Sequence, residues 1–322
     1  MKSINIKVWP EICGYFPLLF VVPKISGKGN PLYLDFKNTK DISSSGLNCF
    51  LFKLIKEINE GVSVNYWFTH DDIISDGFKR ILKLNFFSVL DKYLEGRNDL
   101  WGGAYLKRKQ EAVVTFDDMG LEVKSFPIYM VDFERYDCRR DALIDVREWL
   151  RLIFADYLDD YCFSFTQFQV IINEIVKNTA DHTCANAFIG IDVVRSAITQ
   201  CLDITFSVGD LGEGINNNVR MGLHGKDLSR YRNWDITQTY KAALSDGYTT
   251  KNGSKLNKGL GMSLIMQSAK NMRMSLSVFD AKSRGLLDKI ESITHREIRK
   301  NFYNIDRYVG FAYYGQFKVY KK

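Results

Sequence analysis

Apolar residues recur at helical or strand spacing through most of the first half of the chain. The pattern predicts a strand at Leu32–Phe36, a helix over residues 47–58, a strand at Val62–Phe68 and a helix from Gly77 to Leu94. Glu95–Lys124 is richer in glycine and charged residues, and we interpret it as a linker or excursion between two domains. The first half is therefore expected to alternate strands and helices.

The second half continues with longer periodic segments. Up to the glycine turn at Asp210–Gly214, we expect a strand at Phe126–Phe133, helices at Asp141–Tyr161 and Gln167–Asp181, and strands at Phe188–Val194 and Leu202–Val208. A polar segment follows at Asn216–Lys258. After it we expect a helix from Met262 to about Asn271, a strand at Ser275–Phe279, a helix around Leu286–Arg299 and a strand at Phe317–Tyr320. The fold class predicted for the whole chain is α/β.

Composition narrows the class of protein. The chain has 322 residues, 46% of them hydrophobic and 25% charged, which suits a globular protein of about two domains. Its formal net charge of +6 is mild, so a nucleic-acid partner is not indicated. The 6 cysteines form no C-x-x-C pair, and the apolar stretch Tyr15–Val22 is too short for a membrane helix. We expect a reduced, cytoplasmic protein without a membrane partner.

Two motifs in the second half carry candidate chemistry. Glu174 and Asn178 lie four residues apart on a predicted helix, with Asp181 three residues further on, so they share a face. A carboxylate beside an amide oxygen suits a hard cation and a water molecule. The second motif is Asp210-x-Gly212-x-Gly214 after a strand, where glycines permit close approach of the backbone to a ligand.

A third motif, Lys258-Gly259-Leu260-Gly261, opens a predicted helix. Backbone N–H groups and the helix dipole favour an anion there. The segment lacks the P-loop pattern and the third glycine of the dinucleotide fingerprint. Taken alone, each of these three motifs also fits a solvated helix face or an ordinary turn.

The order and spacing of the three motifs resemble the GHKL ATPase superfamily, which includes the gyrase B subunit, MutL-type repair proteins, sensor histidine kinases and anti-sigma-factor kinases. Glu174/Asn178/Asp181-His182 resembles the N-box, Asp210-x-Gly212-x-Gly214 the G1 box and Gly259-Leu260-Gly261 the G2 box. Gly247–Lys251 and Tyr314–Phe317 resemble the flanking segments of that family. The resemblance covers roughly residues 145–322 and implies a two-layer α/β sandwich with a mixed sheet in a domain spanning 126–322.

The resemblance implies that ATP and Mg²⁺ are the ligands. Asp210 would bind the adenine amine, Asn178 would coordinate Mg²⁺, and Glu174 would be the general base. The remaining expected nucleotide contacts are Asp181, Gly212, Gly214, Lys258, Gly259, Leu260 and Gly261. Asn216–Lys258 would be the ATP lid, and its Lys and Arg residues outnumber its acidic ones. No phosphoacceptor-histidine helix is evident upstream, which argues against a conventional sensor histidine kinase.

The first half has its own resemblance. Leu32–Phe36, followed by Ser43-Ser44-Ser45-Gly46 at a helix start, is similar to the STAS (anti-sigma-factor antagonist) domain, with a core at about 30–95 in a domain spanning 1–125. Ser44 stands where that family carries its phosphorylated serine, although the Asp expected before it is missing. The alternative is that these serines only cap a helix.

Three functions follow from the two resemblances. The first is an ATP hydrolase whose lid closure controls association with itself or with a protein partner. The second is an anti-sigma-type serine kinase that phosphorylates Ser44 or a partner. The third is a nucleotide sensor that does not hydrolyse ATP. Label on Ser44 would favour the second, and binding without turnover the third.

Overall fold

The computed structural model describes residues 2–5, 32–35, 43–59, 64–66, 76–93, 112–116, 120–182, 186–196, 198–212, 214, 236–244, 261–280, 285–287, 290, 302–304 and 311–322. The chain divides into two compact units, and the first comprises Met1–Met130 with Phe188–Ser207. The second comprises Val131–Ala187 with Val208–Lys322. The expected division into 1–125 and 126–322 stays a prediction, and each unit is described by itself.

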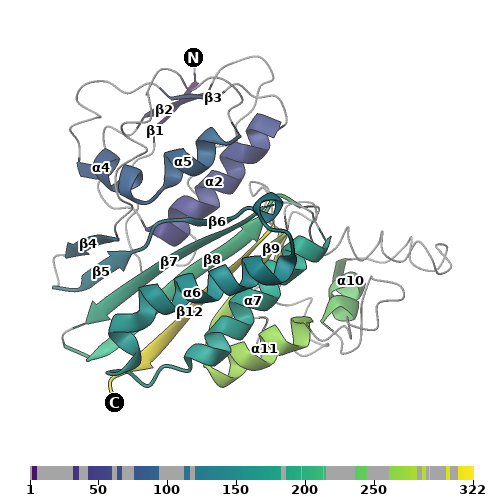
Figure 1. The fold of residues 1–322 in the computed structure, drawn as a ribbon. Coiled ribbons are helices and arrows are strands. Elements are labelled where there is room, and N and C mark those ends of the chain that lie inside the picture. Colours follow the sequence, from purple (N-terminus) through teal and green to yellow (C-terminus); the bar gives the residue numbers. More distant parts are fainter. Residues whose placement is uncertain are drawn as a thin grey trace. The chain divides into compact units, whose positions relative to one another are not determined.

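The first unit begins with a small parallel sheet. Its strands are β1 (Lys2–Asn5), β2 (Leu32–Asp35) and β3 (Val64–Tyr66), paired in that order. Helix α2 (Ser44–Asn59) connects β2 to β3, as the apolar spacing predicts (Figure 1). Parallel neighbours need such a crossover, because a short turn cannot return the chain to the same end of the sheet.

The predicted helix from Gly77 to Leu94 is wrong in one respect, because it is broken. Helix α4 (Asp76–Lys83) and helix α5 (Phe86–Asp91) are separated by Asn85, whose φ of 65° lies in the left-handed region. Asparagine tolerates this conformation better than most residues. The break lets the Phe86 ring stack on Phe50 of α2, with ring centroids 5.8 Å apart.

Part of the predicted linker Glu95–Lys124 is regular structure, while residues 95–111 and 117–119 lie outside the described residues. Strands β4 (Val113–Phe116) and β5 (Glu122–Ser125) form an antiparallel pair, and β5 pairs in turn with β7 (Ala187–Ser196). The strands of this unit follow the order β8-β7-β5-β4, with β6 (Tyr129–Val131) also beside β7. Strand β8 (Cys201–Asp210) begins in the first unit and ends in the second.

In the second unit, helices and an antiparallel ladder form the core. Helix α6 (Arg139–Leu158) follows a 3-10 turn, η2 (Phe133–Arg135), and packs against α7 (Phe165–His182), which also contacts α11 (Gly261–Asn271). Phe154 and Phe168 are both buried, and their rings meet edge to face with centroids 5.5 Å apart. Helix α10 (Ile236–Ala243) lies within the predicted lid segment.

The ladder of the second unit follows the order β11-β10-β9-β12. Its strands are β9 (Ser275–Asp280), β10 (Gly285–Leu287), β11 (Phe302–Asn304) and β12 (Phe311–Tyr320), and every pairing within it is antiparallel. The helix predicted around Leu286–Arg299 is wrong at its start, because Leu286 pairs with Phe279 as part of β10. Apart from residue 290, the rest of that prediction lies outside the described residues. Among the described residues, none of the helices is long and apolar enough to span a membrane.

Candidate functional site

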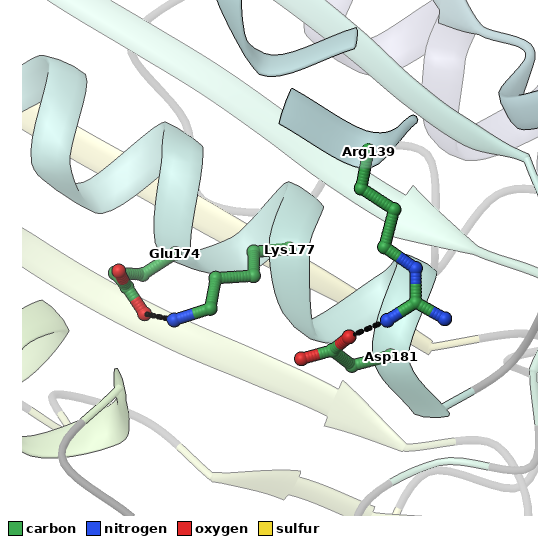
Figure 2. A network of polar contacts seen from close by, with 4 residues as sticks. All are labelled: Arg139, Glu174, Lys177 and Asp181. Atoms are coloured by element: carbon green, nitrogen blue, oxygen red, sulfur yellow. Dashed lines mark hydrogen bonds and ion pairs between the residues drawn. The ribbon is translucent and has the colours of Figure 1, made fainter. Parts of the chain in front are cut away.

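A row of polar side chains lines one face of α7. Glu174, Lys177, Asn178 and Asp181 recur at spacings of three and four residues, which places them along one side of a helix. The Lys177 ammonium lies 3.3 Å from Glu174 Oε2 and donates a hydrogen bond to it (Figure 2). Both side chains are partly exposed, so solvent screens this ion pair.

The start of α11 abuts this face. A Cβ atom added to Gly261 would lie 3.0 Å from Glu174 Oε2 and 3.4 Å from Asn178 Oδ1. Gly261 is the first residue of α11, so the positive end of that helix dipole lies beside the Glu174 carboxylate. The glycine thus lets the backbone of one helix approach the functional groups of another.

Asp210 ends strand β8 and is anchored on both oxygens. The Thr179 hydroxyl on α7 lies 3.1 Å from Asp210 Oδ2, and the Gly212 backbone N–H donates to Oδ1 at 2.6 Å. Thr179 has one hydroxyl proton and also lies 3.2 Å from the Ile175 carbonyl, so it can favour the charged acceptor. Gly214 has a φ of 77°, a conformation that favours glycine, at the end of this turn.

An ion pair between two helices was not predicted from the sequence. Arg139, the first residue of α6, donates from Nη1 to Asp181 Oδ1 (Figure 2). The Asp181 side chain is 8% exposed and the Arg139 side chain 54% exposed. The two residues are 42 positions apart, so no local pattern of residues indicates the pair.

The site brings together acidic, amide and glycine groups from three segments. Glu174, Asn178 and Gly261 are mutually close, and Thr179, next to Asn178, joins α7 to Asp210. Within the part of the chain that the structure describes, no group of three His, Cys, Asp or Glu residues could hold a metal ion. Asn178 Oδ1 and Glu174 Oε2 are oxygen atoms of the kind that a divalent cation accepts as ligands.

Several predicted residues fall outside the described residues. Lys258, Gly259, Leu260 and the Gly247–Lys251 segment are among them, as is the side chain of His182. The Tyr314–Phe317 segment lies in β12.

Ser44, the predicted phosphoacceptor, is the first residue of α2 and is fully buried. Its hydroxyl has no hydrogen-bond partner among the described residues. Phosphorylation of this hydroxyl therefore requires the first turn of α2 to leave its present position. This geometry favours the helix-start interpretation of the serines in this conformation.

A buried carboxylate caps this same helix. The backbone N–H of Ser44 donates to Asp192 Oδ1 at 2.6 Å, and that of Ser45 donates to Oδ2 at 2.9 Å. The Ser45 hydroxyl also donates to Asp192, which lies on β7. Burial raises the pKa of Asp192 above its ordinary value, and hydrogen bonds from Ser125 and from the start of α2 oppose that rise.

Three further hydrogen bonds and one close backbone contact fix α2 on the strands of the first unit. The Asn48 amide donates to the carbonyls of Phe188 and Ser207, at 3.1 and 3.2 Å, and the Ser207 hydroxyl donates to the Ser45 carbonyl at 2.9 Å. At Gly190, an added Cβ would lie only 2.5 Å from the Ser44 carbonyl oxygen. The helix therefore touches the strand backbone directly.

Comparison with protein-family models finds no matching family, and comparisons with curated proteins and with solved structures find no similar protein.

Proposed function

We propose that the second unit binds Mg-ATP and that the protein works as a nucleotide-dependent switch. The observation that carries the proposal is the meeting of α7 with both Asp210 and Gly261. A ligand at this place would meet a carboxylate, an amide and a helix N-terminus together. ATP has a partner for each of them. Its exocyclic amine suits the carboxylate, a cation bound to its phosphates suits the amide oxygen, and the phosphates themselves suit the helix N-terminus.

Each residue has a distinct role in this proposal. Asp210 accepts a hydrogen bond from the adenine amine, while Gly212 and Gly214 let the backbone approach the base. Asn178 Oδ1 coordinates Mg²⁺ together with phosphate oxygens. Gly261, with Lys258, Gly259 and Leu260 before it, holds the phosphates at the start of α11.

Turnover would begin at Glu174. Its carboxylate is held beside Lys177 and the start of α11, where it can orient a water molecule toward the terminal phosphate. Closure of the Asn216–Lys258 segment over the nucleotide would then change a surface for a second copy of the chain or for another protein. A serine kinase would use the same carboxylate with a serine hydroxyl in place of water, and a sensor would use neither.

Incubation with γ-labelled ATP and Mg²⁺ separates these functions. Free labelled phosphate is the result that we expect. Label on the protein indicates a kinase, with Ser44 the first position to map, and binding without release or labelling indicates a sensor. Absence of ATP binding in a calorimetric titration would overturn the proposal itself.

Glu174→Ala is the variant that tests the mechanism. It should keep ATP affinity and lose phosphate release. The matched control is Glu148→Ala, since Glu148 pairs with Arg151 at the same i,i+3 spacing on the exposed side of α6. Equal phosphate release by Glu174→Ala and by the control would remove Glu174 as the base.

A further inference from the structure

We infer that Arg139 binds the phosphate tail of the nucleotide and that Asp181 positions it for that task. This inference rests on the proposed function, because it names a further residue of the same site. It begins with an asymmetry in the Arg139–Asp181 pair, in which the carboxylate is nearly buried and the guanidinium is more than half exposed. The partner is therefore fixed, while the cation faces solvent.

The guanidinium retains most of its hydrogen-bonding capacity. Arg139 uses Nη1 for Asp181, and a guanidinium carries five N–H donors in a rigid, planar fork. That fork matches two oxygens of a phosphate, and Asp181 fixes it before a ligand arrives.

The position of the pair along α7 points to the same ligand. Asp181 lies one turn after Asn178, which we propose as the Mg²⁺ residue, and Glu174 lies one turn before it. Figure 2 shows Arg139 reaching Asp181 on the helix that also carries the Glu174–Lys177 pair. Among the described residues, Glu174 forms an ion pair with Lys177 and Asp181 forms one with Arg139. An incoming polyphosphate needs cations, and Arg139 is the more exposed of the two.

The test compares nucleotides that differ only in their phosphates. The dissociation constants of ATP, ADP and adenosine are measured by calorimetry with Mg²⁺ for the wild type, Arg139→Ala and Arg139→Lys. We expect Arg139→Ala to weaken ATP binding about 10-fold or more and adenosine binding less than about twofold. Arg139→Lys keeps the charge without the fork and should recover part of the loss.

Arg151→Ala is the matched control, because Arg151 is an exposed arginine of the same helix in an ion pair. The double variant Arg139→Ala/Asp181→Ala removes both partners, so no buried carboxylate is stranded if the single variant folds poorly. It should show the same preferential loss of ATP over adenosine.

The outcomes separate the two proposals. Equal weakening of ATP and adenosine, or ATP affinity equal to that of the Arg151→Ala control, would overturn the role of Arg139 while leaving ATP binding intact. Failure of the wild-type protein to bind ATP would overturn the proposed function, and the role of Arg139 would fall with it.

Discussion

Asp192 in the first unit and Asp181 in the second are both carboxylates held between two elements, yet their surroundings differ. Asp192 is fully buried and accepts hydrogen bonds from the backbone N–H groups of Ser44 and Ser45 and from the Ser45 hydroxyl. Asp181 faces a guanidinium that is largely exposed to solvent. The first arrangement fixes a helix on a strand, whereas the second leaves a charged group available to a ligand. In this pair of carboxylates, the partners of Asp192 are all buried, whereas the partner of Asp181 is a cation that solvent and ligands can reach.

Among the substitutions that test this comparison, we expect the largest loss of stability from a change at Gly190. Gly190→Ala should destabilise the first unit by about 3 kcal/mol, because the new methyl group would overlap the backbone of Ser44 and force α2 away from β7. Urea unfolding followed by circular dichroism measures the loss. Gly120→Ala is the control, since nothing lies within 4 Å of its added Cβ and only its φ of 74° is unfavourable. Equal losses in the two variants would contradict the steric argument.

Removal of the Asp192 carboxylate should have the next largest effect. Asp192→Ala leaves two backbone N–H groups and the hydroxyls of Ser45 and Ser125 without this acceptor, at a cost of about 2 kcal/mol. Asp192→Asn should also destabilise, because its amide N–H groups would face other donors. The same urea unfolding measures both variants. A stable, unperturbed Asp192→Asn protein would show that the carboxylate is not needed as a double acceptor.

A substitution at Asp210, in the second unit, should change ligand affinity and leave stability nearly unchanged. Asp210→Asn keeps one oxygen to accept the Gly212 N–H, so we expect little change in unfolding. It removes the charge proposed to meet the adenine amine, and ATP affinity should fall about 10-fold. Calorimetric titration measures this change. An ATP affinity equal to that of the wild type would show that adenine does not bind at Asp210.

The smallest expected effect is that of pH, which changes the ionisation of Asp192 without a substitution. The folded-state pKa of Asp192 is raised, so its contribution to stability is present below the unfolded pKa of 3.8 and is lost as pH rises through the folded value. The free energy of unfolding should therefore fall over that window, by at most about 1.4 kcal/mol per pH unit for one proton. Urea unfolding at several pH values, with Asp192→Asn as the reference, isolates this slope. An unchanged slope in the variant would exclude Asp192 as its source.

Strong periodicity explains what could be predicted from the sequence. The apolar stripes predicted α7, α11 and the strands β7, β8 and β9 close to their observed bounds. Strands β4 and β5 were missed because four residues among glycine and charge carry too little pattern. Leu286 and Leu287 were assigned to a helix, although pairing with β9 makes them part of a strand.

Polar contacts could be predicted only where they join residues that are close together in the sequence. The spacing of Glu174 and Asn178 indicates a shared helix face, because that relation is local. Asp192 gives no such signal, since a single acid in an apolar strand has meaning only beside the start of α2, more than 140 residues earlier in the chain. Arg139 was missed for the same reason, because its partner is on another helix.

Gly190 has a consequence for how this sequence can diverge over evolution. A residue with any side chain at this position would displace α2, and Asp192, two residues later on the same face of the strand, must remain an acceptor. Descendants that keep this packing are therefore confined to Gly-x-Asp in the strand that follows the Glu-x-x-x-Asn helix, with a helix starting at small polar residues upstream. That combination is a signature by which distant relatives can be recognised when little else in their sequences is shared.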